Sequence, residues 1–152
     1  MARLLALATL AALVLAAAAA AATPAQYRAK VNGICRGYTP TFKKLEAKMA
    51  AAQKSGDNQS YGVALGQLLV NGLMQDTKVE AVPIPSALRA RMRPLIAQLK
   101  LVDAHIRAAV LAAANGDQAQ FATNLAAIQK IAPTLNAKFD AAGLRDCGSR
   151  QT

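Results

Sequence analysis

The chain has 152 residues, of which 54% are hydrophobic, and its 18 Lys and Arg outnumber its 8 Asp and Glu, giving a net charge of +10. A chain of this length forms one ordinary domain and buries a real core without extra disulfides or metals. With no Trp, 3 Tyr and 3 Phe, the composition excludes an aromatic core and favours closely packed helices lined by aliphatic side chains and alanine.

The first 22 residues predict a cleavable export signal. Arg3 precedes an apolar run over 4–15, and an alanine tract ends at Ala22, which is the order of parts in a secretory signal. We place cleavage after Ala22, so the mature protein would be secreted or periplasmic. The alternative is an uncleaved membrane anchor, because residues 4–22 are long enough to span a bilayer.

Two helices are predicted next. Thr23 can cap a helix with Gln26 as its capping-box partner, and apolar residues then recur every three or four positions up to Ser55. Pro40 lies inside this run and should kink or break the helix. A second helix should run from Asp57 or Asn58 to about Glu80. Three glycines either weaken this helix or permit close helix approach: Gly62, Gly66 and Gly72.

A proline connector over 82–85 precedes two further helices. The third has the most regular apolar spacing, with Pro94 outside its seam: Leu88, Met92, Leu95, Leu99, Val102, Ile106, Ala109 and Ala113. Asn115-Gly116 ends it, Asp117 and Gln120 can form a capping box, and Gly143 ends a fourth helix that contains Pro133. We expect an all-α, up-down-up-down four-helix bundle over 23–147 with proline-kinked helices, followed by a loose tail over 148–152.

The two predicted turns repeat each other. Gly56-Asp57 with Tyr61 and Leu65 recurs 60 residues later as Gly116-Asp117 with Phe121 and Leu125. Either a helical hairpin was duplicated, or similar capping chemistry arose twice.

Cys35 and Cys147 are predicted to form one disulfide, because thiol pairs in exported chains are usually structural. It would hold the exit of the fourth helix against the first. The spacing Tyr27-x7-Cys35-Arg36, the prolines Pro83 and Pro85, the Gly116-Asp117 turn and the ending Gly143-Leu144-x2-Cys147 resemble small alanine-rich secreted proteins of high-GC bacteria. The resemblance implies an exported helical domain with one N-to-C disulfide, and it implies no activity.

The sequence contains no recognisable catalytic motif. Gly-x-Ser-x-Gly, a phosphate-binding glycine loop and Cys-x-x-Cys-His are all absent from it. The single His105 flanks the third helix's seam and is interpreted as a half-exposed surface residue. No Glu-x-x-His pattern for a metal is present, and the methionines are interpreted as core residues. We therefore expect a non-enzymatic protein without metal or cofactor.

Basic residues gather at one end of the predicted bundle, where the first and third helices begin. The candidate residues for binding an anionic surface are Arg28, Lys30, Arg36, Arg89, Arg91 and Arg93. Such an excess can bind an anionic lipid or polymer, or only keep the surface solvated. The leading hypothesis is an exported domain that associates with an anionic component of the cell envelope. The alternatives are a carrier for a small apolar ligand (lipid or haem) between helices, and an unrecognised enzyme. Export and the lack of interleaved aromatics argue against nucleic acid.

Overall fold

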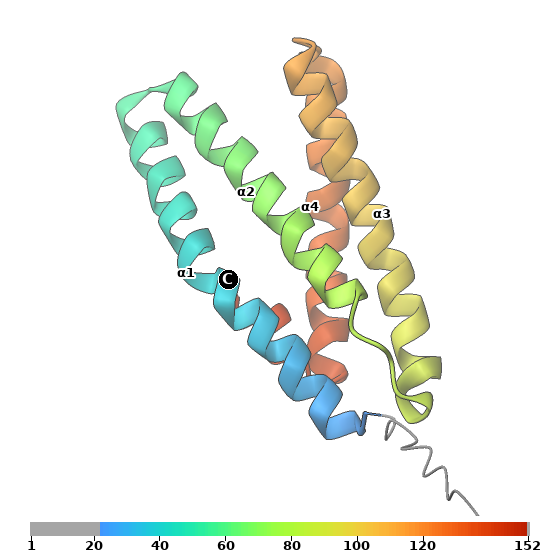
Figure 1. Cartoon of the computed structure of the whole chain (residues 1–152). Coiled ribbons are helices and arrows are strands. Elements are labelled where there is room, and N and C mark those ends of the chain that lie inside the picture. The colour runs from blue at the N-terminus through green and yellow to red at the C-terminus, as the bar shows by residue number, and fades with distance from the viewer. Residues whose placement is uncertain (1–21, 152) are drawn as a thin grey trace, which may run out of the picture.

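The computed structural model describes residues 22–151, which form four helices (Figure 1). These are α1 (Pro24–Ser55), α2 (Asn58–Glu80), α3 (Arg89–Ala114) and α4 (Gln118–Ala141). Two short 3-10 turns, η1 (Ser86–Leu88) and η2 (Arg145–Cys147), precede α3 and follow α4. The predicted all-α fold is therefore confirmed over the described range. The predicted export signal, apart from Ala22, lies outside it.

The helix starts follow the predicted capping chemistry, except that the capping box expected between Asp117 and Gln120 is half formed, because the Asp117 N–H donates to the Ala112 carbonyl. Thr23 and Gln26 make both bonds of a capping box at the start of α1. The Asp57 and Asp117 carboxylates accept the backbone N–H groups of residues 60 and 120 at 2.9 and 3.0 Å. Gly56 and Gly116 both have φ of 72°, and both aspartates have nearly the same backbone angles. The repeated sequence thus gives two turns of one geometry.

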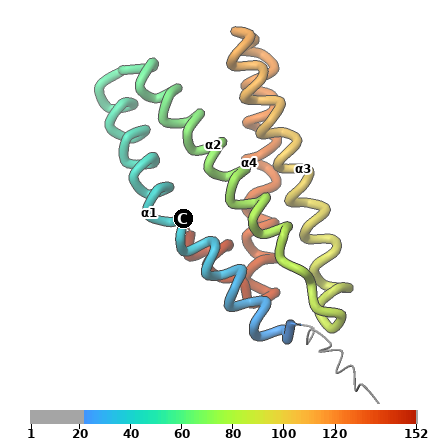
Figure 2. The backbone as a smooth tube through the Cα atoms, in the orientation of Figure 1, coloured from blue at the N-terminus to red at the C-terminus, as the bar shows by residue number. Residues whose placement is uncertain are grey.

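The prolines inside the helices do not interrupt them. Pro40, Pro94 and Pro133 each lie within a continuous helix. α1 changes direction near its middle, where Pro40 lies, without breaking (Figure 2). The Thr39 hydroxyl donates to the Cys35 carbonyl at 3.2 Å one turn earlier, and such back-bonding also favours helix bending.

The four helices form two hairpins, α1–α2 and α3–α4, that are joined through α2 and α3. The hairpins lie close together near the proline connector and diverge towards their two turns (Figure 1). We call the end with the connector and the disulfide the closed end, and the end with Gly56 and Gly116 the open end. The predicted up-down-up-down arrangement is therefore present, but it has the shape of a wedge.

The core fills the closed end and the middle of the molecule. The predicted seam of α3 is buried from Leu88 to Ala109, but its last member, Ala113, is exposed. The first hairpin no longer packs on the seam at Ala113, because the two hairpins have separated at this level. Tyr27, Met92, Leu95 and Leu144 are among the largest fully buried side chains, and all belong to the closed half.

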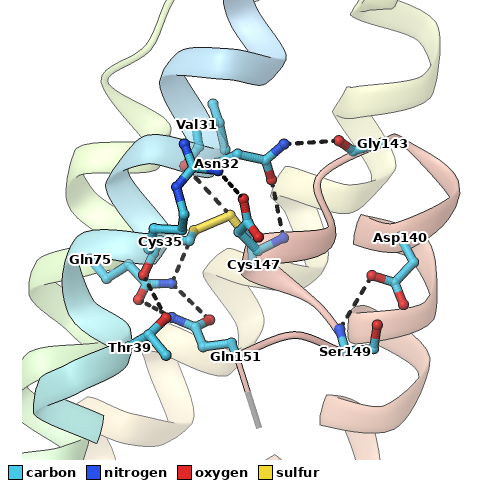
Figure 3. Close-up of a disulfide and its surroundings, with 12 residues drawn as sticks. Val31, Asn32, Cys35, Thr39, Gln75, Asp140, Gly143, Cys147, Ser149 and Gln151 are labelled. Atoms are coloured by element: carbon cyan, nitrogen blue, oxygen red, sulfur yellow. Dashed lines mark hydrogen bonds and ion pairs between the residues drawn. A yellow bond between two sulfur atoms is a disulfide. The ribbon is translucent and has the colours of Figure 1, made fainter.

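The disulfide between Cys35 and Cys147 is present and connects positions 112 residues apart (Figure 3). Polar contacts surround it. The Asn32 amide donates to the Gly143 carbonyl at 3.1 Å and accepts the Asp146 backbone N–H at 3.1 Å. Arg36 forms an ion pair with the buried Asp146. The exit of α4 is thereby fixed to α1, as predicted.

The end of the chain differs from the predicted loose tail. Gln151 exchanges two side-chain hydrogen bonds with the buried Gln75 of α2, at 3.2 and 2.6 Å (Figure 3). Gly148 packs so closely on α4 that a Cβ atom there would lie 2.4 Å from an Asp140 carboxylate oxygen. The disulfide places this segment between the hairpins, where it finds polar partners that sequence spacing could not reveal. Thr152 lies outside the described residues.

Replacing both cysteines with serine should lower the free energy of unfolding by about 4 to 5 kcal/mol, because the bridge closes a long loop in the unfolded chain. Helix content should remain, since the helices have their own caps and seams. Urea unfolding followed by circular dichroism measures both quantities. A double variant as stable as the parent, or two free thiols in the natively isolated protein, would contradict the structural role of the bridge.

Candidate ligand-binding cleft

A cleft of about 510 Å³ lies where the hairpins diverge, between the inner face of α2 and the α3–α4 hairpin. Most of its lining is apolar. α2 contributes Tyr61, Gly62, Leu65, Gly66, Leu69 and Val70, α3 contributes Val110 and Ala113, and α4 contributes Phe121, with Asn58 and Gln118 at the two helix starts. Ligand pockets in proteins are typically about 300 to 1,000 Å³ and mainly apolar. The cleft therefore has the size and chemistry of a small-molecule site.

Two glycines of α2 keep the wall of the cleft open. A Cβ atom at Gly62 or Gly66 would have no neighbouring atom within 4 Å. Close helix approach, one of the two expectations for these glycines, is therefore wrong at both positions. Each glycine costs the helix about 1 kcal/mol relative to alanine, and no packing contact offsets this cost. Of the three glycines, only Gly72 has a neighbour, the Ile106 Cδ1 atom at 3.9 Å.

The repeated turns place one aromatic ring on each side of the cleft. Tyr61 follows the first turn and Phe121 follows the second, and both rings are half-buried. The Tyr61 hydroxyl makes no hydrogen bond within the range that the structure describes. The two equivalent positions thus supply two apolar surfaces and one unused polar group.

The polar groups at the entrance are uncharged amides flanked by carboxylates. Asn58 and Gln118 line the cleft at the starts of α2 and α4, next to the capping residues Asp57 and Asp117. Hydrogen bonding by the backbone of Ser60 lowers the pKa of Asp57, so this carboxylate stays ionised near neutral pH. No Lys or Arg lines the cleft among residues 22–151. The lining therefore offers amides that can hydrogen-bond an uncharged polar group and no cation that could pair with an anion.

A second cavity of about 200 Å³ extends the separation between the hairpins towards the tail. It shares Leu69 with the main cleft and is bounded by Phe42 of α1, Ile128 of α4 and Gln151. A long apolar molecule in the main cleft could therefore continue towards the middle of the fold.

A larger hollow, of about 700 Å³, lies within the first hairpin between α1 and α2. Its lining is mainly polar or alanine, and it includes Lys48, Gln59 and Gln67 but no aromatic ring. It is a shallow surface between two packed helices, so we regard the smaller inter-hairpin cleft as the candidate site.

The six basic residues predicted to bind an anionic surface divide into two groups. Arg28 donates to the Ala142 carbonyl at 2.9 Å and Arg91 reaches the Ala141 carbonyl at 3.4 Å, so both satisfy the end of α4. Arg36 pairs with Asp146. Three residues remain exposed with no ion pair to any described residue: Lys30, Arg89 and Arg93.

The interpretation of the methionines as core residues holds for Met92, which is fully buried, but is wrong for Met74, whose side chain is 51% exposed on α2. His105 is half-exposed and its Nδ1 lies 3.0 Å from the Asn124 side-chain oxygen. Within residues 22–151, no group of three His, Cys, Asp or Glu side chains is arranged to hold a metal ion. None of the helices in this range is long and apolar enough to cross a membrane.

No protein-family model, curated protein or solved structure matches the chain. The functional interpretation therefore rests on the residues that line the cleft. Sequence reasoning noticed Tyr61, Phe121 and the glycines, but it did not join them into a site. The divergence of the hairpins, which brings them together around an open volume, depends on tertiary packing.

Alanine at Gly66 should raise the free energy of unfolding by up to about 1 kcal/mol, because it improves helix propensity and meets no neighbour. The same change at Gly116 is a matched control. It also meets no neighbour, but its positive φ of 72° makes alanine cost about 1 kcal/mol or more. Urea unfolding midpoints show whether each variant is more or less stable than the parent protein. A destabilised G66A variant would show that the cleft wall is packed.

Proposed function

We propose that this chain is an exported binding protein for a small, mainly apolar molecule, which it holds between its two helical hairpins. The single observation that carries this proposal is the open apolar volume next to two glycines that no packing contact requires. Alanine at either position would strengthen α2, and these two glycines differ from the equally unpacked Gly33 and Gly37 in bordering an apolar cleft. Keeping them empty is explained if a ligand occupies the space.

An acyl or isoprenoid chain with an uncharged polar head fits the lining best. The two aromatic rings and the aliphatic side chains contact the apolar part, and the amides of Asn58 and Gln118 can hydrogen-bond the head. The lining contains no Lys or Arg that could pair with an anionic head. Haem is less well supported, because the cleft lining contains no His, Met or Cys, and the phenol of Tyr61 is the one lining group that could bind its iron.

Binding can be tested with N-phenyl-1-naphthylamine, an uncharged fluorophore whose emission rises in apolar surroundings. The purified protein should enhance its emission, and 1-decanol should displace it at lower concentration than decanoate of the same chain length. Leucine at Gly66 should weaken binding of the fluorophore at least tenfold, because its side chain would occupy the cleft.

Leucine at Gly33 is the matched control. Gly33 is an exposed glycine of α1 that also has no neighbour within 4 Å, but it lies outside the cleft. G33L should bind the fluorophore like the parent protein. Equal binding by G66L and the parent would show that the fluorophore binds elsewhere, and no enhancement by the parent would remove the proposal.

Association with an anionic envelope surface is a second candidate. Lys30, Arg89 and Arg93 favour it, because they are exposed and free of ion pairs with other described residues. Each such residue near an anionic surface contributes about 1 kcal/mol or less, and salt screens the effect.

Glutamine at Arg89 and Arg93 together should therefore reduce co-sedimentation with phosphatidylglycerol vesicles at low salt, with helix content unchanged. Glutamine at Arg36 is the control, because that residue is already paired with Asp146. Equal sedimentation of the parent protein with anionic and neutral vesicles would show that these bases only solvate the surface.

A further inference from the structure

Three carboxyl groups lie in the contact between α2 and α3, directly below the cleft. Asp76 and Glu80 belong to α2, and Asp103 belongs to α3. Asp103 is only 8% exposed, and one of its oxygens and one of Glu80 are buried without a hydrogen-bond partner in the described range. Buried carboxylates are costly unless they are paired or protonated.

Positive charge near these groups is scarce. Lys100 of α3 lies 3.9 Å from Glu80, and its side chain is 64% exposed, so the attraction is weak. The titratable group that α1 buries in the core is the phenol of Tyr27, whose pKa is raised by burial, so it stays neutral. α4 buries only Leu135 and Phe139. Asp146 of η2 is paired with Arg36 and Arg150.

Glu80 lies beside Lys100 and Gly72 lies beside Ile106, so the antiparallel register of α2 and α3 places Asp76 opposite Asp103, with little neutralising charge nearby. Burial is the main cause that raises the pKa of Asp76 to about 8, and interaction with Asp103 adds to it. Near neutral pH the pair thus holds a proton. Removing this proton leaves two carboxylates that repel each other in a poorly solvated contact.

The position of the pair connects it to the cleft. One turn from Asp76 along α2, Gly72 contacts Ile106 of α3, and the next turn brings Leu69 into the cleft wall. The closed end cannot yield, because the disulfide and η2 tie the hairpins together there. Repulsion between α2 and α3 must therefore be relieved towards the open end.

We propose that the facing carboxyls of Asp76 and Asp103 act as a proton-dependent latch that sets how far the two hairpins separate around the cleft. The protonated pair holds α2 against α3, and the ionised pair lets the open end widen. The control of ligand entry and release by this motion rests on the proposed function, whereas the motion itself does not.

The motion can be measured without ligand. Spin labels carried by p-acetylphenylalanine at Gln59 and Ala114, two exposed positions at the open end of different hairpins, leave the disulfide intact. The mean label distance should increase by a few ångströms, and its distribution should broaden, as the pH rises from 6 to 9.5. Asparagine at Asp76, which resembles the protonated group, should abolish this change, and so should asparagine at Asp103.

Glutamine at Glu46, an exposed residue of α1 that borders the second cavity but lies outside the α2–α3 contact, is the charge-matched control and should keep the full pH response. An unchanged distance in the parent protein, or an equal change in D76N and D103N, would overturn the latch. Because no ligand is present, absence of lipid binding would leave this result intact, and the two proposals can fail separately.

The pH dependence of the free energy of unfolding provides a second test of the latch. The raised pKa of Asp76 means that the folded state binds more protons than the unfolded state between about pH 4 and pH 8. The contribution of Asp76 to the free energy of unfolding should therefore be largest below this window and fall as the pH rises through it. The urea midpoint of the parent protein should fall between pH 5 and pH 9, and that of D76N should fall less. Parallel curves for both proteins would contradict a shared proton.

Discussion

The covalent and polar tie between α1 and the segment after α4 determines the shape of this protein. Cys35 and Cys147 join them, and the Asn32 and Arg36 side chains add hydrogen bonds and an ion pair around the bridge. Figure 3 shows these contacts around the bridge, which joins η2 to the half of α1 nearer its start. A hairpin held firmly at one end does not need to pack along its whole length, so the other end is left free to diverge.

The open end is less stable than it would be with alanine in place of its two unpacked helix glycines. Gly62 and Gly66 weaken α2 without permitting closer packing, and the seam of α3 loses its cover at Ala113. Rings at the two equivalent positions after the turns face the space that results. The packed core and the bridge thus lie at the closed end, and the open apolar volume lies at the other. The carboxyl groups of Asp76 and Asp103 lie between these two regions. A small change in the repulsion between them should therefore produce its largest movement at the open end.

Much of the fold was predictable because local chemistry specifies it. Caps at Thr23, Asp57 and Asp117, and the regular seam of α3, fix where helices begin and which faces they bury. The disulfide followed from the count and positions of two cysteines. The wedge shape, the ordered tail and the pairing of Asp76 with Asp103 were not predictable, because they depend on contacts between elements far apart in sequence. The basic residues show the same limit, since half of the six candidates satisfy carbonyls or a carboxylate that spacing alone could not reveal.

The central claim is that an apolar molecule enters between the hairpins at the wall formed by Gly62 and Gly66. Titration of ¹⁵N-labelled protein with 1-decanol, followed by amide correlation spectra, tests this claim most directly, because glycine resonances are well separated. We expect the amides of Gly62, Gly66 and Phe121 to shift with saturation, while those of Gly33 and Gly37 on the exposed face of α1 stay in place. Shifts confined to α1 or the closed end, or no saturable shift at all, would contradict the account.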